Sequence, residues 1–148
     1  LKVTVGGQVL KARHPFFSGL YYSGTGSAPQ TDLNNWTFST IEANVGNHFN
    51  NSTGYFTCPV AGRYAVMVCK NRRATPGAWS SIYIMKNSTT MSNNWASSSP
   101  SEEHTPLSAS MVLDCSANDT ISVAWHNSYS APKTGSSNGN YASIWLIG

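Results

Sequence analysis

The stretch FSTIEANVGNHFNNSTGYFTCPVAGRY, residues 38–64, decides the fold class of this chain. Two pairs of turn-forming residues, Gly46-Asn47 and Thr53-Gly54, divide it into short pieces that contain aromatic residues. Such pieces are typical of short β-strands around tight turns. Six residues of the stretch stand at definite gaps of five, four, six, five and one residues: Phe38, Asn44, Phe49, Phe56, Gly62 and Tyr64.

The rest of the chain has the same strand character. Apolar and polar residues alternate, turn residues interrupt the pattern about every 8–12 positions, and no stretch has the period of a helix. The sequence therefore predicts an all-β domain. We expect its strands near residues 16–22, 36–40, 49–57, 64–69, 81–86, 89–95, 107–115, 120–126 and 141–147.

Polar segments separate the later strands. We expect loops at residues 96–106 and 127–140, the first because its two prolines discourage strand pairing. Strands 107–115 and 120–126 are expected to pair as a hairpin across Ser116-Ala117-Asn118-Asp119, four residues that favour a turn.

The spacing from Phe38 to Tyr64 resembles the signature of the globular head domain of complement C1q and its relatives in the tumour-necrosis-factor superfamily. Residues 118–123 resemble the family's Gly-Asp turn and following strand, with Asn118 in place of Gly, and residues 141–148 resemble its final strand. Val66 and Val68 replace aromatic residues of the family pattern, so we expect a differently packed interior. The resemblance implies a two-sheet antiparallel jelly-roll sandwich of about ten strands, C1q/TNF-like.

The resemblance also sets the expected domain organisation. It covers roughly residues 15–148, a length that fits one C1q-like jelly-roll head. Residues 1–14 fall outside it and are expected to be a stalk or lead-in segment. The chain begins at Leu1 without Met, so we expect it to be the processed or excised end of a longer protein with an upstream fibre or stalk.

Composition argues against several classes of partner. The net charge of +3 comes without a basic stripe, so we expect no nucleic-acid partner. The longest apolar run, residues 64–69, is far short of the roughly 20 residues that cross a bilayer, so we expect no membrane insertion. Only 10% of residues are charged, and Ser, Thr and Asn replace them, as is common on extracellular and virion-exposed β proteins.

The cysteines and the titratable residues give no pattern of a catalytic or metal site. Cys58, Cys69 and Cys115 are odd in number, which favours free thiols. The four histidines lack the spacing of a zinc site, and no activated nucleophile or paired carboxylate motif is present, so we predict that the protein is not an enzyme. We expect no cofactor. Because some heads of the superfamily hold calcium, a structural calcium ion stays an alternative, with Asp119 and Asp32 as candidates by residue type only.

Candidate ligand-binding residues are aromatic or basic. Trp79, Trp95 and Tyr129 are expected in loops beside Asn, Ser, Gly or Pro, where an aromatic ring can stack on a sugar while amides bind its hydroxyls. The alternative for both tryptophans is that they cover the sandwich. Arg72 and Arg73, next to Lys70, form the basic cluster, which would attract anionic polymers or simply be a solvated loop.

The resemblance implies that the protein is a trimeric extracellular binding head whose first partner is itself, as a homotrimer. Our leading hypothesis is the receptor-binding tip of a bacteriophage tail fibre, located on the virion, which recognises a host cell-surface polysaccharide or protein. One alternative is a secreted, extracellular C1q-like pattern-recognition or signalling ligand on a collagen-like stalk. A second is a structural cap that trimerises a fibre.

Overall fold

The computed structural model describes residues 2–3, 9–10, 14–20, 34–73, 79–97, 104–127, 133–134 and 140–147. Within these ranges the regular elements are all β-strands. The described residues contain no helix that is long and apolar enough to cross a membrane. The all-β prediction is therefore confirmed. The strands are β1 (Lys2–Val3), β2 (Val9–Leu10), β3 (Phe16–Leu20), β4 (Asn34–Asn35), β5 (Thr40–Val45), β6 (Phe49–Asn50), β7 (Tyr55–Thr57), β8 (Gly62–Arg73), β9 (Trp79–Lys86), β10 (Thr89–Ser97), β11 (His104–Cys115), β12 (Thr120–Asn127), β13 (Lys133–Thr134) and β14 (Tyr141–Leu146).

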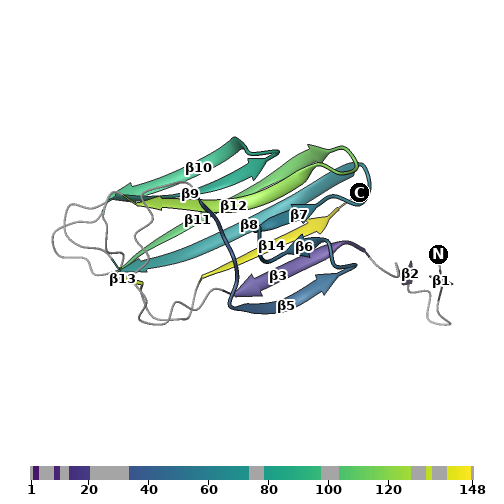
Figure 1. Ribbon diagram of the computed structural model, residues 1–148, viewed down its shortest axis with the longest axis horizontal. Helices are drawn as coiled ribbons and strands as arrows, with labels where there is room; N and C mark the ends of the chain where they lie inside the picture. The colour runs from purple at the N-terminus through teal and green to yellow at the C-terminus, as the bar shows by residue number, and fades with distance from the viewer. Residues whose placement is uncertain are drawn as a thin grey trace.

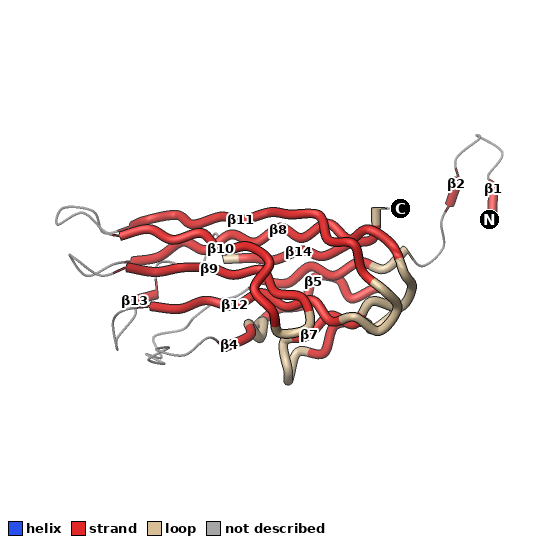
Figure 2. Tube along the Cα trace, turned by 90° about the horizontal axis from the view of Figure 1, so that it is seen from above, coloured by secondary structure: helices blue, strands red, loops and turns tan. Residues whose placement is uncertain are grey.

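Two antiparallel sheets form the sandwich, and their long strands run along a common axis (Figures 1 and 2). One sheet has the strand order β10-β9-β12-β7-β6, with β4 also pairing with β12. The other has the order β11-β8-β14-β3-β5, with β13 also pairing with β8. Among the described strands, β1 and β2 pair with each other as a separate two-stranded sheet. Because consecutive strands often lie in different sheets, the arrangement is the predicted jelly roll.

The aromatic residues of the signature meet in the core between the sheets. The ring of Phe17 from β3 stacks on Phe49 at 3.8 Å between centroids, and Phe38 packs edge-on against Phe17 at 5.1 Å. Phe56 and Tyr64 make a further edge-on contact at 5.9 Å, and all five side chains are buried. The fixed spacing of the signature residues therefore reflects which positions along the chain must fill the space between the two sheets.

Asn44, the polar member of the signature, closes the turn between β5 and β6. Its side-chain amide donates to the Phe49 carbonyl at 2.9 Å, and its Oδ1 accepts from the Phe49 backbone N–H at 3.0 Å. Gly46 and Asn47 inside the turn have positive φ angles of 83° and 57°, which glycine and asparagine adopt at low cost. The amide thus replaces backbone partners that the tight turn leaves unpaired.

The prediction of a strand at 36–40 was wrong. Trp36, whose N–H donates to the Val123 carbonyl at 2.8 Å, and Phe38 lie outside the strands but are both buried. Their alternation reflects a connecting segment that inserts two rings into the core. The strand in this region is β5, an edge strand with mostly exposed side chains, which gave no apolar alternation to detect.

The predicted hairpin was also wrong. β11 pairs with β8 and β12 pairs with β9 and β7, so the two strands belong to opposite sheets. Each strand has apolar side chains on one face, and these side chains pack into the core from opposite sides. The residues 116–119 do form a turn, and Asn118 has a positive φ of 70°.

Pro106 lies within β11 and is paired with Asn71, although we expected it in a loop. β11 is at the edge of its sheet, where a residue without an N–H is tolerated.

The sandwich has two ends that differ in what they carry. At the terminal end β3 begins, β14 ends, and the turns at 46–47, 58–61, 87–88 and 116–119 connect strands. At the opposite, distal end β8 finishes with Arg73 and β9 starts with Trp79. The predicted ligand-binding residues 72, 73, 79 and 95 are therefore on the distal half of the strands.

Candidate functional site

Two of the five predicted ligand-binding residues come together. Trp79 begins β9 and Trp95 is near the end of β10, so both are in strands and not in the loops that we expected. The register pairs Ser97 with Trp79 and Trp95 with Ser81, which places the two tryptophans on a diagonal of neighbouring strands. They do not cover the core, because 36% of Trp79 and 64% of Trp95 remain exposed.

Both tryptophans line a groove of about 290 Å³ on the outward face of the sheet. Along β9 the side chains of Ser80, Ile82 and Ile84 are buried, while the alternate positions face the groove. We call this the aromatic groove. The described residues that line it are Trp79, Ser81, Tyr83, Asn93 and Trp95.

Neighbouring strands hold the aromatic groove in place. The Trp79 ring packs edge-on against His126 of β12, with centroids 4.8 Å apart and an interplanar angle of 71°. Ser81 Oγ donates to the Tyr83 hydroxyl at 3.0 Å, and Ser81 is nearly fully buried. Because Tyr83 accepts this bond, its own hydroxyl proton can be donated to a ligand.

The other predicted ligand-binding residues do not join the groove. Arg72 and Arg73 end β8, where their backbones pair with Thr105 and His104 of β11 and with Thr134 and Lys133 of β13. Tyr129 lies outside the described residues.

Lys70, the first member of the basic cluster, belongs to the interior. It is buried, and its Nζ is 2.7 Å from the centroid of the Trp125 ring. The cluster that the sequence showed as contiguous is thus divided, with Lys70 in the sandwich and the arginines at the strand end.

A second surface lies on the outward face of the sheet β11-β8-β14-β3-β5. Strand pairing aligns one residue from each strand, and the five aligned residues are all apolar. Of these, 38% of Val45 and 53% of Val112 are exposed. We call them the apolar row, and the sheet surface around them the apolar face. The apolar row consists of Val45, Phe16, Trp145, Ala65 and Val112.

The next aligned positions continue the apolar face toward the distal end. Met67 is 41% exposed, and beside it Ser143 Oγ donates to Ser18 Oγ at 3.1 Å. One row further, Cys69 is flanked by Tyr141 and Ser108. No lysine, arginine, aspartate or glutamate occurs in these three rows among the described side chains, so the surface is suited to close contact with another apolar surface.

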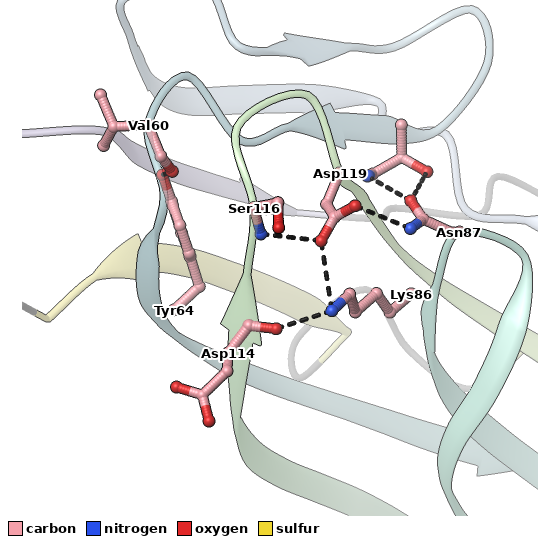
Figure 3. Close-up of polar contacts among 8 residues, drawn as sticks. Val60, Tyr64, Lys86, Asn87, Asp114, Ser116 and Asp119 are labelled. Carbon is pink, nitrogen blue, oxygen red and sulfur yellow. Dashed lines mark hydrogen bonds and ion pairs between the residues drawn. The ribbon is translucent and has the colours of Figure 1, made fainter.

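Asp119, our candidate calcium ligand, already has a cationic partner. Its carboxylate accepts from Asn87 Nδ2 and from the Ser116 N–H, each at 2.8 Å, and lies 3.2 Å from Lys86 Nζ (Figure 3). These contacts, led by the Asn87 hydrogen bond, lower the pKa of Asp119 to about 2. Its arrangement therefore fits a clamp on the turn. Asp32 lies outside the described residues.

The described part of the chain holds no group of three or more His, Cys, Asp or Glu side chains that could share a metal ion. Cys58, Cys69 and Cys115 carry free thiols, and burial raises the pKa of each one. Thiolates are therefore scarce near neutral pH.

Sequence reasoning missed the residues that complete both surfaces. Tyr83 and Asn93 share the period of 2 with Trp79 and Trp95, so strand alternation could have placed them on one face. The apolar row had no such signal. Its five residues come from five strands that are far apart in sequence, and only the strand order brings them into line.

Comparison with known proteins agrees with this architecture. The globular domain of zebrafish complement 1qA protein has a similar structure, with a TM-score of 0.66 and 20% sequence identity over 91% of this chain and 98% of that chain. At this identity the likeness concerns the fold. A search of curated proteins gave no significant match. The family model of the C1q domain matches residues 21–144, which is most of the chain. This protein therefore belongs to the C1q domain family.

Proposed function

We propose that this protein is a non-enzymatic, extracellular binding head that acts as a homotrimer, with residues 1–14 as its lead-in segment. The apolar row is the observation that carries the proposal. A partly exposed row of apolar side chains across a whole sheet is costly in water, and burial against another copy removes this cost. C1q domains are generally extracellular binding domains that form trimers, which supports threefold association here.

The mass of the purified protein, measured by light scattering after size exclusion, tests this proposal. We expect three times the chain mass at micromolar concentration. Met67→Glu places a carboxylate on the apolar face and should yield single chains, because an unpaired buried charge costs about 3 kcal/mol or more. Met91→Glu is the matched control, since Met91 on β10 has a similar exposed fraction of 43% but lies on the other sheet. A monomeric wild type would overturn the proposal.

For the biological setting we propose the tip of a bacteriophage tail fibre that recognises a host surface polysaccharide or protein. The three free thiols support it, because secreted domains usually pair their cysteines. So does a surface in which Ser, Thr and Asn replace charged residues, with only 10% of residues charged. Three copies of a weak site would bind a repetitive cell surface with useful avidity.

A second candidate is a secreted C1q-like recognition or signalling ligand. The similarity to the zebrafish complement domain and the extracellular character of the family favour it. Labelled trimer applied to bacterial cells and to animal cells separates the two candidates. Selective binding to bacteria supports the fibre tip, and binding to animal cells alone supports the secreted ligand. Binding to neither, with the trimer intact, would favour the fibre cap.

A further inference from the structure

We infer that the aromatic groove binds one uncharged pyranose unit of a polysaccharide, which packs against Trp79 and Trp95. The inference names the ligand class of the head proposed above and rests on that proposal. It is carried by the two exposed tryptophans, the polar groups beside them and the absence of charge among the described lining residues.

The size and the walls of the aromatic groove suit a sugar ring. Trp79 and Trp95 occupy diagonal positions of paired strands, where large side chains can contact the same ligand. The groove volume of about 290 Å³ is close to the lower limit of ligand sites, which is about 300 Å³. The groove therefore suits a small ligand such as one sugar unit.

The polar groups of the groove suit hydroxyls. The Tyr83 hydroxyl accepts from Ser81 and keeps its proton for a ligand, and the exposed Asn93 amide offers both a donor and an acceptor. Sugars combine apolar C–H faces with hydroxyls at the rim, which is the complement of aromatic walls with amide and hydroxyl groups beside them. No lysine, arginine, aspartate or glutamate is among the described lining residues, so these residues offer no charged partner to a carboxylate or sulfate group on the sugar.

The groove is also held ready before a ligand arrives. His126 packs against the Trp79 ring, and Ser81 hydrogen-bonds to the Tyr83 hydroxyl, so two of the ligand contacts would come from side chains that are already restrained. Restrained contacts lose less conformational entropy on binding than free ones. The groove faces outward from the sheet opposite the apolar face, so trimer formation through the apolar row leaves it exposed.

Binding to immobilised polysaccharides tests the inference. The probes are neutral polymers (dextran, mannan, β-1,3-glucan and galactan) and anionic ones (hyaluronate and polygalacturonate). We expect the wild-type trimer to bind at least one neutral polymer. Trp79→Ala and Trp95→Ala should each weaken that binding about tenfold or more. Tyr83→Phe, which keeps the ring and removes the hydroxyl, should weaken it about two- to tenfold.

Met91→Ala is the control, since it truncates an exposed side chain of β10 outside the groove, and its binding should equal that of the wild type. Size exclusion of every variant separates loss of the site from loss of the trimer. A trimer that binds no neutral polymer, or whose binding survives both tryptophan changes, would overturn the inference. Binding only to anionic polymers would also overturn it and point to the Arg72 and Arg73 end. Binding only to a protein from the host surface would also overturn the inference.

Single-site binding separates the failure of this inference from the failure of the trimer. In the Met67→Glu variant, tryptophan fluorescence titrated with an oligosaccharide of the bound polymer should still report binding, at the weaker affinity of one groove. A monomeric wild type with such binding would contradict the trimer and leave the groove supported. A trimeric wild type without oligosaccharide binding would contradict the sugar site in the groove and leave the trimer supported.

Discussion

The two outward faces of the sandwich carry different chemistry on the same kind of strand. On the apolar face one aligned row is entirely apolar across five strands, whereas the opposite sheet groups two tryptophans with hydroxyl and amide groups. A row without polar groups gains most from contact with another apolar surface, while a surface with both kinds of group suits a ligand that has both. The difference teaches that one fold can separate self-association from ligand recognition by assigning each to one sheet.

The largest expected effect comes from placing the same charge on each face in turn. Val112→Asp, in the apolar row, should dissociate the trimer, because three unpaired carboxylates would be buried at a cost of about 3 kcal/mol or more each. Trp95→Asp should leave the trimer intact while abolishing polysaccharide binding. Sedimentation velocity of both variants checks this pair. Equal dissociation by both changes would contradict the separation of roles.

A substitution at Gly19, in the core between the two sheets, tests how strongly the stability of the sandwich depends on core packing. A Cβ at this position would lie 2.7 Å from Phe38 Cγ and 2.8 Å from Phe17 Cζ, closer than carbon atoms approach. Gly19→Ala should therefore lower the free energy of unfolding by about 1–3 kcal/mol, measured by urea denaturation. Ser18→Ala, at the neighbouring position on the apolar face, is the control and should change it much less. If Gly19→Ala were as stable as the wild type, the rings of Phe17 and Phe38 would have to move aside at little cost in free energy.

The thiols report which face is covered in solution. Cys69 is half-buried on the apolar face, whereas Cys58 and Cys115 are buried in the core. We expect Cys69 to react with an aromatic disulfide reagent about ten times faster in Val112→Asp than in the wild-type trimer. Cys58 and Cys115 should stay slow in both, since burial raises their pKa. A Cys69→Ser variant assigns the fast phase. Unchanged Cys69 kinetics would place the interface elsewhere.

The smallest expected effect concerns the clamp of Asp119, which supports neither face directly. Its pKa falls from 3.8 to about 2 in the folded protein, so the carboxylate stabilises the fold above about pH 4 and this contribution disappears as the pH falls toward 2. Asp119→Asn should lower the thermal midpoint slightly at pH 7, and the difference from the wild type should vanish near pH 2. The clamp would be irrelevant to stability if thermal scans at pH 7 showed no difference.

Much of the fold followed from residue spacing because each signature residue has a local task. Phe38, Phe49 and Phe56 fill the core, and Asn44 closes a turn through two hydrogen bonds to Phe49. Such tasks restrict residue type at fixed positions along the chain. The prediction of a strand at 36–40 was wrong for the opposite reason. The burial of Trp36 and Phe38 imitates strand alternation in a connecting segment that lies outside the strands.

The candidate site was predictable in part. Trp79 and Trp95 stood out as large rings among polar residues, and the structure brings them together. Their exposure, and the addition of Tyr83 and Asn93, depend on the register between β9 and β10. The turn at Asn87 and Ser88 sets this register, and a bulge between Thr90 and Ser92, which residue alternation does not predict, then shifts it. Arg72 and Arg73 looked continuous with Lys70, but burial of Lys70 beside Trp125 divides them.

By itself, the sequence determined the all-β class, the family and the residues that pack between the sheets, because alternation, turns and ring volumes act within a few residues of one another. Only the tertiary structure decided that β11 and β12 part into opposite sheets, that five distant residues align as the apolar row, and that two tryptophans form one groove. The first two features depend on strand order, which is fixed by packing between segments far apart in the chain. The groove depends on the bulge between Thr90 and Ser92 of the β9–β10 hairpin. Local composition carries little information about either.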